Sequence, residues 1–263
     1  LLGIVLLGIR LSIAGVLLVG VKGLGIVVGC IAGGLGCTLL FGRLLSLPKR
    51  LSTLIGVGTS ICGVSAITAA GPAMEAEDEE ISYAISVITV FGIFATLVYP
   101  VLAHFLFAGD AELAGFFLGT AIHDTSQVAG AAVVYADTYG QPEALNVATV
   151  TKLVRNLFMA LIIPLAAWLH ARRALTDGVE VSVRRRWTSY VPLFVLGFLL
   201  LAVVRSVGDM TAAGSGRAFG VLAPDAWASA IGHTRRAAAW LLVIALAGVG
   251  LKTRFHAMRS MGV

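Results

Sequence analysis

The chain has 263 residues, of which 58% are hydrophobic and 13% are charged, and its net charge is +5. With a mean hydropathy of +0.95, it has too little polar surface to cover a soluble globule of this length. The basic residues stand in loops beside apolar runs rather than along one face, which argues against a nucleic-acid partner. The composition therefore predicts an all-α integral membrane protein, a polytopic helical bundle whose main partner is the lipid bilayer.

In chain order, the apolar runs predict six ordinary helices and two unusual segments. The helices are expected at 1–19, 22–42, 81–107, 147–170, 188–207 and 236–253, with an irregular stretch at 208–234. Because the first residue is a leucine inside an apolar run, we expect one transmembrane domain, 1–263, that is truncated at both ends. Three cysteines without metal-ligand spacing predict neither a disulfide framework nor a metal site.

Clusters of basic residues indicate how the chain is oriented in the membrane. Cytoplasmic loops carry an excess of lysine and arginine, so we place three clusters on the cytoplasmic side. Each cluster follows an apolar run. They comprise Arg43, Lys49 and Arg50; Arg172, Arg173, Arg184, Arg185 and Arg186; and Arg254 and Arg259. The chain is thus expected to be a multi-pass protein of a bacterial inner membrane.

The two unusual segments contain similar motifs that lie 61 residues apart. Residues 58–65 read GTSICGVS and residues 119–126 read GTAIHDTS. Each motif lies in a segment expected to be broken, 51–75 and 113–136, and each is followed by an apolar helix with a late proline, Pro100 or Pro164. This pattern predicts an internal repeat with units of about 51–107 and 113–170. If both segments turn back within the membrane, the repeat is inverted, and we favour this version over two full crossings.

Both motifs place polar groups inside apolar surroundings, which is typical of a transporter's substrate site. Broken helices expose backbone N–H groups that suit an anion, and hydroxyl side chains add further donors. The predicted substrate-binding residues are Thr59, Ser60, Gly63, Ser65, Thr120, Thr125, Ser126 and Gln127. Histidine titrates near neutral pH, so His123 with Asp124 is a candidate for proton exchange.

The helix after the second motif carries three polar residues in its first turns, Lys152, Arg155 and Asn156. Lys152 and Arg155 are three residues apart and share a helical face. We expect them to attract an anion towards the motifs or to balance the charge of Asp124. Snorkelling of Lys152 to the membrane surface is the alternative.

These motifs, with GIRLS at 8–12, TKLVRN at 151–156 and GLKT at 250–253, resemble the YeiH-type family of proposed sulfate exporters. The resemblance spans nearly the whole chain. Members of this family are similar to the cation/proton antiporter and anion transporter superfamily. The resemblance implies inverted repeats, interrupted helices and an elevator-like or rocking cycle that moves sulfate or a related sulfur oxyanion.

Two other function classes stay open at this point. An intramembrane hydrolase could use Ser60, Ser65 or Ser126 with His123 and Asp124, but neighbouring helical side chains point about 100° apart. The other class is a membrane sensor or scaffold that does not transport. No cofactor is expected. The sequence does not decide between coupling to protons and coupling to sodium. It also leaves open the substrate, the direction of transport and the oligomeric state, which includes the possibility of a homo-oligomer.

Overall fold

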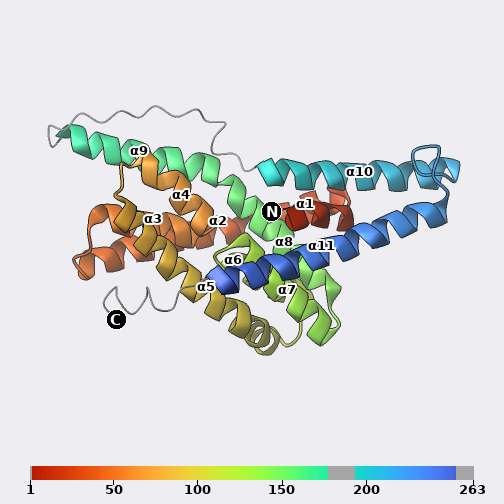
Figure 1. The fold of residues 1–263 in the computed structure, drawn as a ribbon, viewed down its shortest axis with the longest axis horizontal. Helices are drawn as coiled ribbons and strands as arrows, with labels where there is room; N and C mark the ends of the chain where they lie inside the picture. Colours follow the sequence, from red (N-terminus) through yellow and green to blue (C-terminus); the bar gives the residue numbers. More distant parts are fainter. Residues whose placement is uncertain (1, 177–192, 253–263) are drawn as a thin grey trace.

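Helices make up nearly all of the described structure. The computed structural model describes residues 2–176 and 193–252 (Figure 1). Four helical stretches within these residues are long and apolar enough to cross a membrane, which confirms the predicted all-α membrane fold. They are Ile13–Leu44, Asp78–Leu106, Pro142–Leu169 and Leu196–Ser215.

The first broken segment is a helical hairpin, α3 (Lys49–Ser60) followed by α4 (Val64–Ala73). At its base, Nη1 of Arg50 donates a hydrogen bond of 2.9 Å to the carbonyl oxygen of Glu75. A straight helix would hold these two residues about 37 Å apart. The reversal occurs at Gly63, whose φ of 60° and ψ of −121° favour glycine.

The second broken segment is also a hairpin, formed by α6 (Ala111–Ala121) and α7 (Thr125–Tyr139). Nε2 of Gln141, just after α7, donates a hydrogen bond of 2.5 Å to the carbonyl oxygen of Gly109, just before α6. Gly140 ends α7 in the left-handed conformation that commonly terminates helices. Both segments therefore fold back on themselves, so that the two ends of each hairpin lie together; that they turn back within the membrane stays a prediction.

The long helix α5 (Asp78–Leu106) connects the bases of the two hairpins. It begins with a capping box between Glu77 and Glu80, and its 29 residues span about 43 Å. The hairpins consequently start from opposite ends of α5 and point towards each other. Their tips meet between these ends, since the ideal Cβ position of Gly63 lies 3.5 Å from the carbonyl carbon of His123. That the hairpins descend from one repeated unit stays a prediction.

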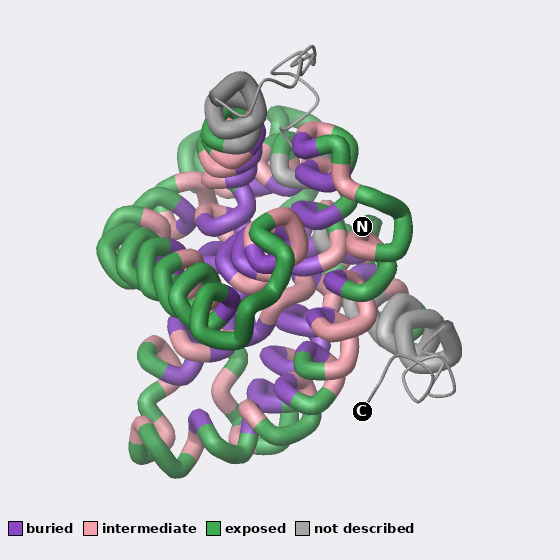
Figure 2. Tube along the Cα trace, turned by 90° about the vertical axis from the view of Figure 1, so that its left-hand side faces the viewer, coloured by how far each residue is buried: buried purple, intermediate pink, exposed green. Residues whose placement is uncertain are grey.

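Two further helical stretches flank the hairpins. The helix α2 (Ile13–Leu44) packs against α3, and α8 (Pro142–Leu157) packs against α6 and α7. A short interruption at Phe158 separates α8 from α9 (Met159–Thr176), which packs on α4. Buried residues gather in the middle of this bundle, and exposed apolar residues cover its outside (Figure 2).

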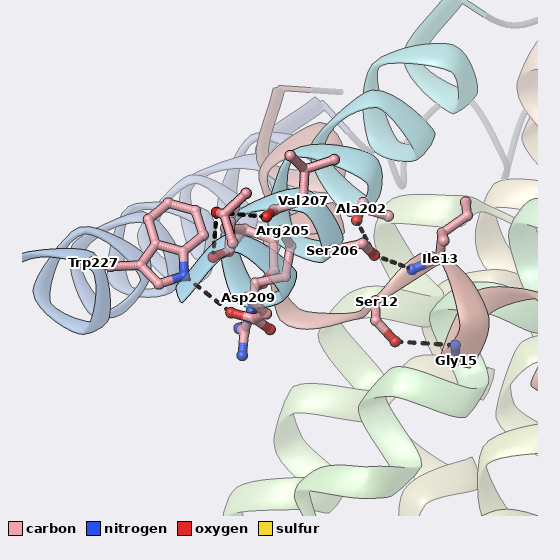
Figure 3. A network of polar contacts seen from close by, with 12 residues as sticks. Ser12, Ile13, Gly15, Ala202, Arg205, Ser206, Val207, Asp209 and Trp227 are labelled. Carbon is pink, nitrogen blue, oxygen red and sulfur yellow. Dashed lines mark hydrogen bonds and ion pairs between the residues drawn. The ribbon is translucent and has the colours of Figure 1, made fainter. Parts of the chain in front are cut away.

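A further interruption lies near the start of the chain, between α2 and the preceding α1 (Leu2–Leu7) and 3-10 helix η1 (Gly8–Arg10). Helices α10 (Leu193–Ser215) and α11 (Pro224–Lys252) pack against α1; the connection between them lies far from the hairpins, and α11 runs back from it to pack against α7 (Figure 1). Side chains of α10 bind the backbone at the interruption (Figure 3). Ser206 Oγ accepts a 2.7 Å hydrogen bond from Ile13 N, and Arg205 Nη1 donates one of 3.2 Å to Ile9 O.

Several predicted helix bounds are wrong. The predicted helices 1–19 and 22–42 are divided at Leu11 and Ser12 rather than at 20–21, because glycine costs a helix only about 1 kcal/mol and the Ser12 hydroxyl caps α2. The stretch 208–234 is mostly helical, since Pro224 suits a first helical turn and starts α11. The predicted helix 147–170 begins at Pro142 and is interrupted at Phe158.

Further bounds differ at the predicted basic loop and at the helix that follows it. The loop, 171–187, is helical as far as Thr176, and the predicted helix 188–207 extends to Ser215. Residues 177–192 and 253–263 lie outside the described residues, together with the basic residues that the sequence places in them: Arg184, Arg185, Arg186, Arg254 and Arg259.

Candidate functional site

Lys152 of α8 lies where the two hairpin tips meet, and it binds both of them. Its side chain is fully buried. Nζ donates hydrogen bonds to three backbone carbonyl oxygens, at 3.0 Å to Ile61 in the first hairpin and at 2.9 Å and 2.5 Å to Ile122 and His123 in the second. The lysine is not directed to the membrane surface, so the snorkelling alternative is wrong.

Arg155, one helical turn further along α8, binds the same two tips and is 3% exposed. Its Nε donates a hydrogen bond of 2.6 Å to Ser60 O, its Nη2 donates to Thr59 O, and its Nη1 donates to Thr120 O. The planar guanidinium thus bridges the end of α3 and the end of α6. A cation with donors in one plane suits such a set of fixed acceptors.

Together the two cations satisfy the carbonyl ends of both broken helices. The last carbonyls of a helix lack partners within the helix and carry a negative partial charge. At α3 and α6 these groups accept from Lys152 and Arg155, so the negative ends are neutralised. The N-termini of α4 and α7, with their positive partial charge, start at the same two tips. The meeting point is therefore electropositive.

Asp124 caps the helix α7. Its Oδ1 accepts hydrogen bonds of 2.8 Å from Ser126 N and 2.5 Å from Ser126 Oγ. No hydrogen bond joins Asp124 to His123 within the described part of the chain, so the predicted proton exchange between these two has no direct contact to support it. The N-terminus of α4 differs, because Gly63 has no side chain with which to cap it.

Several buried polar atoms around the tips have no hydrogen-bond partner among the residues that the structure describes. Such atoms are rare in proteins, since each costs free energy comparable to a lost hydrogen bond. The atoms themselves are buried, and their residues come from α3, α7, α8 and the second tip. They are Ser60 Oγ, His123 Nδ1, Gln127 Oε1, Thr151 Oγ1 and Asn156 Oδ1.

Most of the sequence-predicted site residues belong to this centre, but they contribute in different ways. Thr125 Oγ1 accepts a 3.1 Å hydrogen bond from Asn156 Nδ2. Thr120 uses its hydroxyl within its own helix, donating 2.7 Å to Phe116 O. Ser65 is exposed in the first turn of α4.

Two residues at the centre were not selected from the sequence. Thr151 precedes Lys152 and lies four residues before Arg155, a spacing that places it on the same helical face and could have indicated it. Gly92 of α5 lets Gln127 approach closely, because a Cβ there would lie 2.9 Å from Cδ and Nε2 of Gln127. No local sequence signal distinguishes this glycine from those that face open space.

A cavity of about 730 Å³ leads to the tips between α2, α3 and α5. One end reaches Thr59 and His123, whose carbonyl oxygens accept hydrogen bonds from Arg155 and Lys152. Its other end lies at the connection between α2 and α3. The side chains that line it are mainly apolar, including Phe41, Ile55, Val87, Phe91 and Phe94.

Comparisons with known proteins agree with a bacterial membrane protein. The family model described as Conserved hypothetical protein 698 matches residues 1–263, in agreement with the predicted YeiH-type resemblance. A UPF0324 membrane protein of Streptococcus agalactiae serotype V is 38% identical over 205 residues, which cover 78% of this chain and 60% of the relative. One from Streptococcus pneumoniae is 34% identical over 255 residues, 97% of this chain and 70% of the relative.

A third relative, the UPF0324 membrane protein of Clostridium tetani, is 29% identical over 271 residues, 99% of this chain and 72% of the relative. The chain spans about 60% of the length of the Streptococcus agalactiae relative. No solved structure matches this chain.

Proposed function

Since this chain belongs to the family of Conserved hypothetical protein 698, to which UPF0324 membrane proteins of bacteria are similar, we propose that it is a secondary transporter of a small anion. It is a multi-pass protein of a bacterial inner membrane. Under the proposal, the anion binds where the hairpin tips meet. Sulfate or a related sulfur oxyanion is the substrate that the YeiH-type resemblance implies.

The observation that carries this proposal is the charge at the meeting point. Two cations, Lys152 and Arg155, are buried beside one carboxylate, that of Asp124, so the formal charge is positive. Buried charge is costly and is usually balanced. The neutralised ends of α3 and α6 add no negative field, whereas the starts of α4 and α7 add a positive one. An anion would complete the balance, and the unpaired hydroxyl groups of Ser60 and Thr151 could donate hydrogen bonds to it.

The geometry favours transport over the hydrolase alternative. In a nucleophile triad the histidine binds both the serine and the carboxylate. Here the Ser126 hydroxyl donates directly to Asp124, and His123 Nδ1 has no partner among the described residues. A scaffold or sensor does not require a buried electropositive centre. We therefore keep the transporter as the proposal.

The same contacts favour proton coupling over sodium coupling. A sodium ion would need carbonyl oxygens freed at the helix breaks. Those of Ile61 and Ile122 already accept hydrogen bonds from Lys152, and Arg155 binds those of Ser60 and Thr120. His123 is half-buried at the tip with a free ring nitrogen, and it is the group placed to exchange a proton.

The test is flux measured in liposomes. The reconstituted protein should take up labelled sulfate in response to an imposed pH gradient and not to a sodium gradient. His123→Ala should remove the pH dependence, and Ser60→Ala should reduce the flux. If sulfate, sulfite and taurine all fail to cross under either gradient, the transporter proposal is wrong and the sensor alternative gains support.

A charge-changing substitution on α8 tests whether the site binds an anion. Asn156→Asp adds a carboxylate at a position with no solvent exposure beside Thr125, and we expect it to weaken anion affinity by roughly tenfold or more through like-charge repulsion. Competition of unlabelled sulfate against labelled uptake gives this affinity.

The matched control for Asn156→Asp is Asn146→Asp on the same helix. Asn146 Oδ1 accepts a 3.2 Å hydrogen bond from Arg10 Nε, so the new carboxylate gains a cation there and should leave affinity unchanged. Equal affinity in both variants would argue against an anion at the hairpin tips.

A further inference from the structure

We propose that the transported anion carries an apolar body, and that the cavity between α2, α3 and α5 holds this body while the charged group lies at the hairpin tips. The inference rests on the proposed function and specifies its substrate class as an amphiphilic organic anion. It starts from the size of the cavity. A tetrahedral oxyanion needs the space of roughly two or three water molecules of about 30 Å³ each, whereas the cavity measures about 730 Å³.

The lining of the cavity changes in character along its length. A stripe of α3 forms one side, with Ser52, Ile55 and Thr59 spaced by three and four residues on one helical face. Aromatic and aliphatic side chains of α2 and α5 form the other sides. At the end nearest the tips are Thr59 and His123, and His123 Nδ1 has no partner within the described residues. The cavity is thus an open groove, since Phe41, Phe91 and Phe94 in its lining are mostly exposed, and its polar end lies beside the carbonyls that bind Lys152 and Arg155.

Positive charge near the other end of the cavity also suits an amphiphilic anion. Leu45 and Leu47 line the cavity where α2 connects to α3. Close to them in sequence, Arg43 and Lys49 are exposed, and Arg50 starts α3 beside Lys49. An anion approaching from this end meets positive charge first, and its apolar part then has the phenylalanines to contact. An uncharged apolar molecule would gain nothing from either end.

A homologous series of alkanesulfonates tests the inference. Methanesulfonate, propanesulfonate and pentanesulfonate are compared as competitors of labelled sulfate uptake into liposomes. The half-inhibitory concentration should fall by about two- to fourfold for each added methylene group, as expected when each becomes buried. Equal inhibition by all three would overturn the inference and leave the proposed anion transport intact.

A substitution that fills the cavity tests whether the alkyl chain is held in the cavity or in the bilayer. Cys37 lines the cavity on α2, whereas Cys30, also exposed on α2, does not. Cys37→Trp should abolish the dependence on chain length, and Cys30→Trp should retain it. The same dependence in both variants would mean that the alkyl chain partitions into lipid, which contradicts the inference.

Thiol labelling tests the cavity without relying on transport. In a Cys30→Ala variant, pentanesulfonate should slow maleimide modification of Cys37 at least several-fold, and sulfate or pentan-1-ol should not. In a Cys37→Ala variant, modification of Cys30 should not respond to pentanesulfonate. Protection of Cys37 without any sulfate uptake would support the binding site and refute only the proposed transport. Equal protection by pentan-1-ol would show an apolar site without anion preference and overturn the inference.

Discussion

Replacing Lys152 by methionine is expected to abolish anion flux and to lower the free energy of unfolding by about 3 kcal/mol. The side chain keeps its length but loses three hydrogen bonds, so the carbonyls of Ile61, Ile122 and His123 are left buried without a donor. Each unsatisfied acceptor costs about 1–3 kcal/mol, offset in part because a buried ammonium is no longer desolvated. Thermal unfolding in detergent and sulfate uptake in liposomes measure the two effects.

The control is Lys22→Met on α2. Lys22 Nζ binds Glu112 Oε1 at 2.9 Å, but its side chain is 51% exposed. An exposed ion pair contributes about 1 kcal/mol or less, so stability and flux should change little. Similar small changes in both variants would mean that the hairpin tips hold together without Lys152, which would contradict its role in joining them.

Much of the fold could be predicted from the sequence because the bilayer leaves few choices. Long apolar runs must be helical, and so 81–107 corresponds closely to α5 (Asp78–Leu106). Helix ends were harder to predict where the signals are weak. The predicted boundary at 20–21 lies inside α2, and the interruption before α2 is stabilised by Arg205 and Ser206, which are far away in sequence.

The sequence predicts which residues belong to the candidate site better than it predicts what each of them does there. Ser60, His123 and Asn156 can be selected from the sequence because placing a polar side chain in an apolar membrane segment costs free energy. The roles of Lys152 and Arg155 depend on which carbonyls the two hairpins bring to α8, and no pattern in the sequence states this. The close contact of Gly92 with Gln127 depends likewise on how α5 packs against α7.

Replacing Gly63 by alanine is expected to stop transport through a change of one methyl group. Gly63 has φ 60° and ψ −121°, a backbone conformation that side chains with a Cβ disfavour by roughly 2 kcal/mol. The added Cβ would also lie 3.1 Å from Cγ2 of Ile88 and 3.5 Å from the carbonyl carbon of His123. The contact with His123 is an ordinary packing distance, but the strained backbone and the tight contact with Ile88 on α5 require the first tip to shift, and the carbonyls that bind Lys152 and Arg155 would shift with it. Sulfate uptake and thermal unfolding are measured together.

Gly140→Ala provides the comparison, because this glycine also has a positive φ but lies at the base of the second hairpin. Its φ of 67° and ψ of 27° are left-handed helical values, and a Cβ there meets nothing within 4 Å. Alanine should cost about 1 kcal/mol and leave the tips in place, so flux should persist at a somewhat lower unfolding temperature. If Gly63→Ala retains flux as Gly140→Ala does, transport does not depend on the exact position of the first tip. The binding centre would then lie within one hairpin rather than between the two.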